Sequence, residues 1–394
     1  MTTQAGVGRS LASSPFTAGS EAASEAMEAL DGAADLVLVF GTAAYDAVQL
    51  LEGVRSVVGD ARISGCSGEG IIAGSDSHEV SRAVAVMAFR SNRMRFESFV
   101  LGGYGDDPAG CAASLARAVA EFDDGRVLIV LPDGLVGDCT AFLDALDRAA
   151  PDNLTIVGGT AGDEFQFEKT YQYDGTEAVT GAVAAVLIRG DVHAEVAVSH
   201  GCVPIGMERI ITKSEGGWVH ELDGRPAWEV FKEYLDGNPE DLTAEGIVHL
   251  CIGERLDDDR ASNYDTHIIR TPMQLDQESG ALFFPGGGLL EGNRIQLTRR
   301  DEQKIRDSAE ACARSILKRG AERRPDLVLQ FDCSGRGRIL FGPCAGEAIV
   351  EPLRNTLGPD VPWIGFHTYG EIAQIKGKSY YHNYTVALCA LYEQ

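Results

Sequence analysis

The sequence predicts an α/β protein of two domains, with mixed β-sheets covered by helices. One pattern occurs three times along the 394 residues: a strand-like run, an amphipathic stretch, a second strand-like run and a turn rich in Gly, Ser and Thr. Alternating apolar residues then predict a further strand or hairpin. A strand that returns through a helix favours a parallel neighbour, whereas a hairpin adds antiparallel strands. Repeated αβαβ-plus-hairpin units therefore predict mixed sheets with helical cover.

The elements follow the same order in each copy. The first copy reads ADLVLVF, AAYDAVQLLEGV, ARISG, CSGEG and SRAVAVMAF. The second reads GRVLIVL, DCTAFLDALDRAA, LTIVGG, TAGDEF and TGAVAAVLI, and the third reads PDLVLQF, PCAGEAIVEPL, PWIGF, HTYGE and YHNYTVALCAL. Amphipathic spacing predicts a helix before each copy, over residues 21–30, 109–122 and 302–319.

The stretch between the second and third copies, residues 203–297, departs from the pattern. It predicts a helix over residues 225–235, with proline in the first turn, and several short strands before a PGGG turn. We therefore expect a flexible segment over residues 1–29, an N-terminal domain over 30–205 with copies one and two, and a C-terminal domain over 206–394 with the insertion and copy three.

Composition excludes several classes of function. The formal net charge of −25 disfavours nucleic acid and anionic membranes as partners, and the basic run KRGAERR is typical of a solvated helix end. Neither a secretory signal nor an apolar run of membrane-spanning length occurs. The nine cysteines show no C-x-x-C spacing, which argues against a disulfide framework and a zinc ribbon. We expect a cytoplasmic protein that does not insert into membranes.

The three turns are candidate ligand sites, because open α/β sheets bind ligands at the carboxyl ends of their strands. Glycines and successive N–H groups form a nest for a carboxylate or phosphate. Ser67, Thr160 and Thr368 add hydroxyls, and Glu69, Asp163 and Glu371 add acids that bind an ammonium group. The combination predicts an amino-acid-like ligand. The alternative is that these residues only build tight, capped turns.

Copy three carries the largest number of polar candidates. His367, Thr368, Tyr369 and Glu371 lie at its turn, while His382 and Asn383 open its last strand; Cys333, Arg336 and Arg338 follow its first strand. An arginine at this edge can hold a carboxylate through two hydrogen bonds. Surface charges are the equally weighted alternative for Arg336 and Arg338.

An enzyme requires a nucleophile with a base. Cys66, Cys333, His367 and His382 are candidates, but no motif frames them, and no metal-binding motif occurs. We predict no catalytic residue and no metal. The HGC run at residues 200–202 offers imidazole and thiolate, either of which binds haem iron.

Several of these motifs together resemble the FIST family, with an N-terminal and a C-terminal FIST domain. They are GCSGEGIIAG, GGTAGDEFQF, GRPAWEVFKEYL, GFHTYGEIA and YHNYTVALCAL, and the resemblance covers about residues 30–392. It implies a bacterial sensory domain that binds small ligands such as amino acids; some relatives are haem proteins that sense nitric oxide and act on a histidine kinase or a cyclic-di-GMP enzyme. The matching positions are Cys66, Ser67, Trp228, Thr368, Tyr369, Gly370, Glu371, His382 and Asn383.

The leading interpretation is a stand-alone cytoplasmic sensor that binds a small polar ligand, catalyses no reaction and signals through a separate partner. The second is a haem-based nitric-oxide sensor, with His200, His367 or His382 as axial ligand. The third is a hydrolase that uses Cys66 or Cys333. The predicted ligand-binding set is Cys66, Ser67, Glu69, Thr160, Asp163, Cys333, Arg336, Arg338, His367, Thr368, Tyr369, Glu371, His382 and Asn383.

Overall fold

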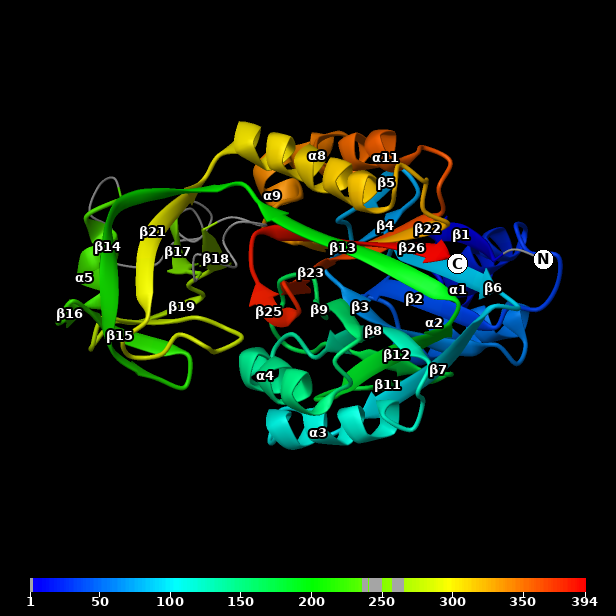
Figure 1. Ribbon diagram of the computed structural model, residues 1–394, viewed down its shortest axis with the longest axis horizontal. Helices are drawn as coiled ribbons and strands as arrows, with labels where there is room; N and C mark the ends of the chain where they lie inside the picture. The colour runs from blue at the N-terminus through cyan, green and yellow to red at the C-terminus, as the bar shows by residue number, and fades with distance from the viewer. Residues whose placement is uncertain (1–2, 236–239, 241–249, 257–265) are drawn as a thin grey trace.

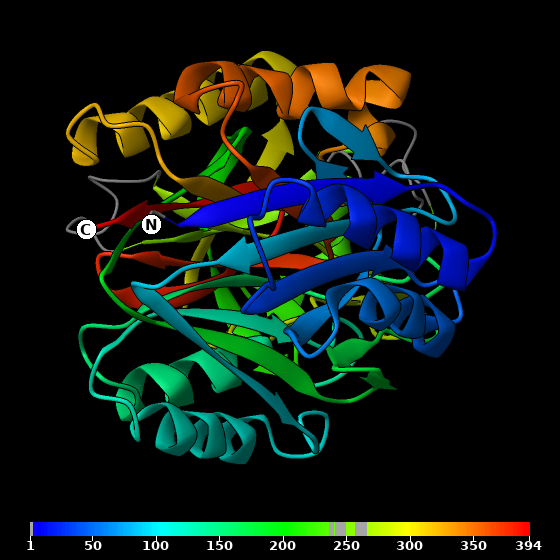
Figure 2. The same cartoon turned by 90° about the vertical axis from the view of Figure 1, so that its right-hand side faces the viewer.

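The computed structural model describes residues 3–235, 240, 250–256 and 266–394. Three six-stranded sheets form the body of the molecule, and an insert of antiparallel strands lies at one end, opposite both termini (Figure 1). Helices cover the outer face of each sheet, so helical layers surround the body on three sides (Figure 2). The predicted α/β class with mixed sheets is confirmed.

Unit one begins with an edge strand and a helix that lie within the segment expected to be flexible. Ser14 caps the helix, Pro15 occupies its first turn, and small alanine side chains let it pack closely against the next helix. These contacts order residues 4–27. The unit consists of β1 (Gln4–Ser10), α1 (Pro15–Met27), β2 (Leu36–Thr42), α2 (Ala47–Val58), β3 (Arg62–Gly68), β4 (Gly70–Ala73), β5 (Asp76–His78) and β6 (Val84–Arg90).

Unit two has the same order of elements. Asp107 and Asp138 cap its two helices, whose apolar faces cover the outer side of the sheet. The unit consists of β7 (Met94–Leu101), α3 (Pro108–Val119), β8 (Gly125–Pro132), α4 (Cys139–Ala149), β9 (Thr155–Thr160), β10 (Gln172–Asp174), β11 (Glu177–Val179) and β12 (Val183–Gly190).

Unit three is interrupted by the insert, which leaves after β13 and returns before α8. Its second helical region is broken into short pieces, because Gly342 has a positive φ and Pro343 and Pro352 punctuate the run. The unit consists of β13 (Val192–His200), α8 (Glu302–Arg319), β22 (Leu327–Cys333), α9 (Arg338–Phe341), η1 (Gly342–Cys344), α10 (Ala345–Ile349), α11 (Glu351–Leu357), β23 (Trp363–Thr368), β24 (Gly370–Ile375), β25 (Lys378–His382) and β26 (Thr385–Glu393).

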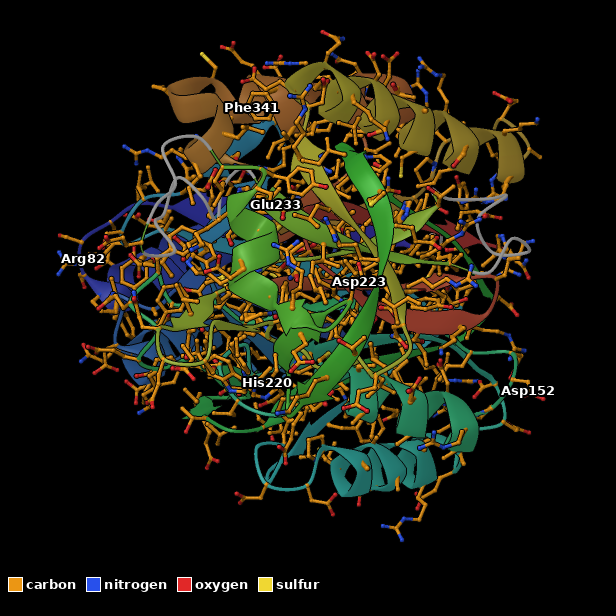
Figure 3. All side chains as sticks on the ribbon, turned by 90° about the vertical axis from the view of Figure 1, so that its left-hand side faces the viewer. Arg82, Asp152, His220, Asp223, Glu233 and Phe341 are labelled. Carbon is orange, nitrogen blue, oxygen red and sulfur yellow. The ribbon has the colours of Figure 1, made fainter. Side chains whose placement is uncertain are left out.

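The insert has its own core, in which Trp228 and Phe231 pack against the strands. Figure 3 faces the insert, where Asp223 and Glu233 lie near the viewer; each accepts a hydrogen bond of 3.2 Å from Arg209. The helix expected over residues 225–235 spans only α5. The insert consists of β14 (Cys202–Glu215), β15 (Trp218–Leu222), β16 (Arg225–Pro226), α5 (Ala227–Lys232), β17 (Leu250–Arg255), β18 (His267–Arg270), β19 (Gln274–Asp276), β20 (Ala281–Phe283) and β21 (Arg294–Arg300).

The three units exchange hairpins in a cycle. Each sheet has a parallel pair of its own, namely β2–β3, β8–β9 or β22–β23. The hairpin β4–β5 joins the sheet of unit three, β10–β11 joins that of unit one, and β24–β25 joins that of unit two. Every unit thus completes the sheet of another unit. The domain boundary expected at residue 205 remains a prediction. Two of the three sheets contain strands from both sides of that boundary.

A ring of backbone hydrogen bonds marks the point where the hairpins cross over. The N–H of Glu69 donates to the carbonyl of His367 at 2.9 Å, that of Gly162 to Ser67 at 3.1 Å, and that of Tyr369 to Thr160 at 3.2 Å. Each bond joins one unit to the next. Glu69, Gly162 and Tyr369 therefore occupy equivalent positions at one end of the body.

Glycine is required at one position of each unit, four residues before this ring. A Cβ on Gly65 would lie 1.8 Å from the carbonyl oxygen of Val39, and Gly158 and Gly365 have neighbours at 1.9 and 2.0 Å. These glycines fix the alignment of the units. His367 thus takes the place of Ser67 and Thr160, one residue away from the predicted equivalent, Thr368.

The central core is formed by the inner faces of all three sheets. Alternate residues of the strands β2, β8 and β22 point inward, so that Phe40, Leu131 and Phe331 belong to one apolar cluster. The intervening residues pack under the helices of their own unit. The loops that follow β8, β9, β22 and β23 lie beside the insert, with which they line a cavity.

Candidate functional site

A cavity of about 420 Å³ lies between the insert and the loops at the carboxyl ends of the central strands. Small-molecule sites commonly have ~300–1,000 Å³. The body contributes Gly134, Leu135, Phe165, Phe167, Cys333, Ser334, Gly335, Ile339, Tyr369, Tyr381, Asn383 and Tyr384, and the insert contributes Thr271, Met273, Gln274, Phe283 and Pro285.

The lining is aromatic and uncharged. It contains six phenylalanine and tyrosine rings, a few hydroxyl and amide groups, and none of the Asp, Glu, Lys, Arg or His side chains of the described residues. Carboxylates and ammonium groups lose their hydration in such a cavity without a charged partner to replace it. The cavity therefore favours an uncharged guest with one or two hydrogen-bonding groups.

Three aromatic rings meet at one wall of the cavity. Tyr369 follows β23, and Phe165 and Phe167 lie on the loop after β9. The Tyr369 ring stacks on Phe165 at 5.9 Å and on Phe167 at 5.6 Å between centroids. The two phenylalanines remain 37% and 50% exposed. Large exposed rings beside a cavity offer faces to a bound molecule.

Asp163 holds the phenylalanine loop in place. Its carboxylate accepts hydrogen bonds from the N–H groups of Phe167, Glu168 and Lys169 at 3.1, 2.7 and 3.0 Å. Glu164, Phe165 and Phe167 have φ angles of 61°, 57° and 54°, a left-handed conformation that costs free energy in residues other than glycine. The carboxylate offsets that cost, so the predicted site residue Asp163 shapes the wall from behind.

Asp163 and the neighbouring Glu69 also hold the Tyr369 hydroxyl in place. The hydroxyl donates to Asp163 at 2.5 Å and accepts from the N–H of Phe165 at 2.8 Å. Burial, together with the neighbouring Glu69, raises the pKa of Tyr369 above its ordinary value. The hydroxyl therefore stays protonated and serves as a fixed donor.

Glu69 lies next to this hydroxyl and accepts from the N–H of Phe165 at 2.8 Å. Burial raises the pKa of Glu69 to about 8, the Phe165 N–H opposes the rise, and Glu79 adds to it. Burial likewise raises the pKa of Glu79 to about 7. Glu69 is thus mainly protonated at neutral pH and supports the wall as a neutral group.

Asn383 connects the insert to the body. Its Oδ1 accepts from the N–H of Thr271 at 3.2 Å, and its Nδ2 donates to the carbonyl of Tyr369 at 3.2 Å. The backbone N–H of Asn383 donates to the carbonyl of Ile269. A single side chain thus positions both walls of the cavity.

Two buried guanidinium groups lie behind the tyrosines of the cavity. Arg270 lies 5.4 Å from the ring centre of Tyr381, and Arg300 lies 4.5 Å from that of Tyr384. Cation–π contacts of this kind fix ring orientation. These arginines stabilise the wall without contributing charge to the lining.

Of the fourteen predicted site residues, the structure brings Cys333, Tyr369 and Asn383 to the cavity, with Glu69 and Asp163 directly behind Tyr369. The others lie elsewhere. Cys66 belongs to the central core, and the hydroxyls of Ser67 and Thr160 donate to the carbonyls of Gly162 and Gly370, so their contacts build the turns.

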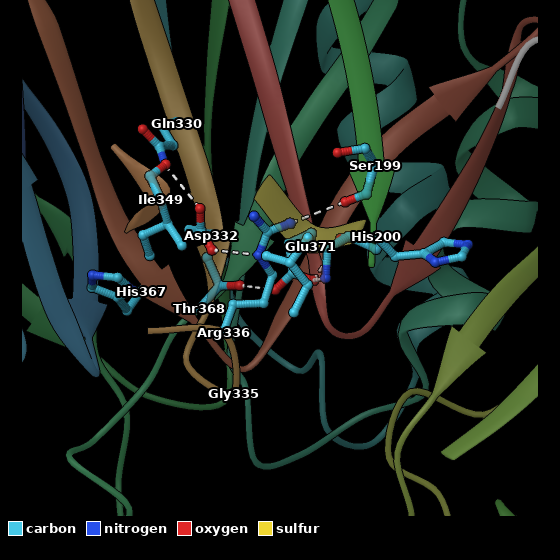
Figure 4. A network of polar contacts seen from close by, with 12 residues as sticks. Ser199, His200, Gln330, Asp332, Gly335, Arg336, Ile349, His367, Thr368 and Glu371 are labelled. Carbon is cyan, nitrogen blue, oxygen red and sulfur yellow. Dashed lines mark hydrogen bonds and ion pairs between the residues drawn. The ribbon is translucent and has the colours of Figure 1, made fainter. Parts of the chain in front are cut away.

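The predicted arginine clamp has other partners. Arg336 is fully buried, lies 3.2 Å from Asp332 and donates to the carbonyl of Ser199 (Figure 4). The Asp332 carboxylate also accepts from Gln330 at 2.8 Å. Arg338 is exposed, and its backbone N–H donates to Glu79. Neither guanidinium lines the cavity.

The remaining candidates of copy three form buried contacts. His367 lies 2.8 Å from the hydroxyl of Ser77, and burial lowers its pKa to about 4. The Glu371 carboxyl accepts from Thr368 and Thr385, and burial raises its pKa to about 8. Burial lowers the pKa of His382 to about 3. These groups are neutral near pH 7 and pack inside the fold.

The sequence did not predict most of the aromatic rings that line the cavity. Phe165, Phe167, Tyr381 and Tyr384 lie within motifs whose acids and hydroxyls predict the ligand site. Aromatic residues at the carboxyl ends of strands were an available signal for these four. No sequence signal placed the lining residues of the insert, because their position depends on how the insert packs.

The three histidines considered for haem do not fit that role. His200 lines a second cavity, one of about 580 Å³ between β13, α8 and the turn after β24. Its Nδ1 accepts a hydrogen bond from the N–H of Cys202 at 3.0 Å, so the neutral ring carries its proton on Nε2, where iron would bind. His367 and His382 line neither of these two cavities.

The cysteines considered for hydrolysis are poor nucleophiles in this structure. Burial raises the pKa of the Cys66 and Cys333 thiols well above their ordinary value. The thiolate is the reactive form, and a catalytic cysteine has a lowered pKa. Among the described residues, no group of three His, Cys, Asp or Glu side chains is arranged to hold a metal ion.

The fold and cavity define a class: an α/β protein of three interlocked sheets, with an inserted domain that closes an uncharged cavity. The model of the FIST N domain matches residues 35–225, and that of the FIST C domain matches residues 227–374. The chain belongs to the FIST family. FIST domains are sensory domains of signal-transduction proteins. None of the described helices is long and apolar enough to span a membrane.

Similar proteins include an uncharacterised protein of Mycobacterium tuberculosis, 28% identical over 97% of this chain and 98% of the relative. An uncharacterised protein of Mycobacterium bovis is 26% identical over 93% of each chain. Among solved structures, a cyanuric acid hydrolase from A. caulinodans aligns with a TM-score of 0.26 at 12% identity, over 48% of this chain and 72% of that one. Similarity at this level carries no information about what this chain binds.

Proposed function

We propose that this chain is a cytoplasmic sensory protein that binds a small polar, uncharged molecule in the cavity between insert and body. The cavity carries the proposal: it combines a fitting size, an aromatic wall and a lining shared by two parts of the fold. Ligands shift a conformational equilibrium only through different affinities for its states. A ligand in a cavity between two packed parts binds more tightly when the parts are close together, so its affinity differs between conformations that differ in their packing.

The signal passes to a separate partner, a histidine kinase or a cyclic-di-GMP enzyme. The family assignment supports a role in signal transduction. All nine cysteines are free, as is common in a reducing compartment, and this supports the cytoplasmic location. The charged groups expected to hold an amino acid lie outside the lining, so the cavity supports a ligand without formal charges.

Native and denaturing mass spectrometry of the purified protein tests the proposal. We expect a small mass that is retained in the native spectrum and lost on denaturation. Ile339→Trp places an indole at an exposed lining residue and blocks the cavity, so this variant should lose the mass. Val48→Trp, an equally exposed change on α2, is the matched control and should retain it.

Two results would contradict the proposal. One is a bound mass that Ile339→Trp retains. The other is a wild-type protein that carries no small molecule and gains no stability with any member of a metabolite library. A Soret band in the visible spectrum would instead indicate that haem is the ligand.

A further inference from the structure

Among the described residues that line the cavity, one buried side-chain polar atom, Oγ1 of Thr271, lacks a hydrogen-bond partner. Thr271 follows β18, lines the cavity and is 6% exposed. Its Oγ1 has no hydrogen-bond partner among the described residues, whereas its backbone N–H is held by Asn383. Leaving a buried hydroxyl unpaired costs free energy, so such groups commonly have a partner. In this conformation Oγ1 is enclosed by protein, and a rotation about the Cα–Cβ bond of Thr271 would turn it toward a bound molecule, which then supplies the partner.

The lining offers ring faces in two groups. Tyr369 with Phe165 and Phe167 forms a stacked set whose phenylalanines are exposed. Tyr381 and Tyr384 have a guanidinium group at one face of each ring. Aromatic faces attract flat rings through offset stacking and contribute apolar area. A flat guest fits this geometry better than a branched aliphatic one.

We infer that the ligand is an uncharged, planar heteroaromatic ring, which stacks on the Phe165–Phe167–Tyr369 wall and hydrogen-bonds through its polar edge to Oγ1 of Thr271. This inference rests on the proposed function and specifies its ligand class. Among the described residues no charged side chain lines the cavity, and this disfavours zwitterions and anions. The formal net charge of −25 adds to the barrier against anions.

Ligand-observed NMR with a defined panel tests the class. The panel contains uracil, adenine and nicotinamide as planar rings, 5,6-dihydrouracil as a puckered match for uracil, and L-glutamate and L-arginine as charged amino acids. We expect binding of at least one planar ring, weaker binding of dihydrouracil than of uracil if uracil is the ring bound, and no binding of the amino acids. Ile339→Trp should abolish the signal.

Thr271→Val separates recognition from folding. The change removes the hydroxyl at nearly constant shape, so we expect the bound ring to lose about tenfold in affinity. The free protein should be as stable as wild type or more stable, because an unpaired buried hydroxyl is removed. Thr298→Val is the matched control: its Oγ1 is also buried without a partner among the described residues, but it does not line the cavity.

The outcomes distinguish the ligand class from the proposed function. If amino acids bind and planar rings do not, and Ile339→Trp abolishes that binding, the cavity is the site but the ligand class is wrong. If none of the planar rings binds to the wild-type protein, the inferred ligand class is also wrong. The proposed function is then still tested separately by the native mass-spectrometry experiment. Unchanged affinity in Thr271→Val excludes that hydroxyl as the recognition group.

Discussion

At the scale of single residues, burial decides which predicted groups keep their expected chemistry. The sequence predicts Glu69 and Glu371 as anionic contacts for an ammonium group, but burial raises the pKa of each to about 8. His367 and His382 are held neutral by burial, with pKa values of about 4 and 3. The sequence gives the chemical type of a side chain, but its surroundings in the fold determine whether it is charged.

Glu69 makes stability depend on pH. Its pKa is raised from an ordinary 4.5 to about 8, so the folded state holds a proton that the unfolded state releases between these values. The folded state therefore loses this contribution as pH rises through that window. We expect Glu69→Gln to become increasingly stable relative to wild type between about pH 5 and pH 8, measured by urea unfolding.

Glu177→Gln, at an exposed glutamate of β11, controls for the loss of one negative charge. A stability difference between Glu69→Gln and wild type that stays constant across this window would show that Glu69 titrates normally. Glu79 and Glu164 also interact with Glu69 and remain in both proteins, so the comparison isolates Glu69 itself.

Asp163 is predicted to be the main support of the phenylalanine loop. Asp163→Asn removes the charge that three N–H groups and the Tyr369 hydroxyl share, and hydrogen bonds to charged groups contribute about 1.5–3 kcal/mol. We expect a loss of that size in the free energy of unfolding and faster proteolysis within residues 164–168. Glu168→Gln, an exposed change of equal charge on the same loop, should alter stability by less than ~0.5 kcal/mol.

At the scale of elements, the hairpin exchange depends on close contact between parallel strands. Gly158 lies where a Cβ would be 1.9 Å from the carbonyl oxygen of Val130. We expect Gly158→Ala to lower the free energy of unfolding by ~3 kcal/mol, the upper part of the range for overpacking, because backbone must move to admit the methyl group. Thermal and urea unfolding measure the effect.

Gly102→Ala is the control, since a Cβ there meets nothing within 4 Å. It should leave stability unchanged or slightly increase it by restricting the unfolded chain. Equal effects of the two substitutions would mean that β8 and β9 tolerate a wider separation than the structure shows.

At the scale of the whole molecule, Asn383 couples the insert to the body. Asn383→Ala leaves the N–H of Thr271 without its side-chain partner and removes one of the two side-chain donors to the carbonyl of Tyr369, the other being the Tyr381 hydroxyl. We expect hydrogen exchange to accelerate in residues 266–285 and calorimetry to show the insert unfolding at a lower temperature than the body. Ligand affinity should fall as well, because both walls lose their common support.

Asn293→Ala is the matched control, because Asn293 donates to Glu254 and Gly288 within the insert. It should weaken the insert without changing how the insert is held against Tyr369. If both variants unfold in a single transition, Asn383 stabilises the fold but does not couple its two parts.

The sequence by itself determined the α/β class, the order of elements in each copy, and the departure from that order over residues 203–297. The periodicity of apolar residues and the composition are local properties of the chain, so they identify helices and strands directly. The sequence also predicted a ligand site at the carboxyl ends of the strands, and of the residues predicted for it Cys333, Tyr369 and Asn383 lie at the cavity. Only the tertiary structure decided that hairpins exchange between units and that Phe165, Phe167 and Thr271 share one cavity. The contacts between units and across the cavity join residues about a hundred or more positions apart, and packing and burial, rather than local pattern, select such partners.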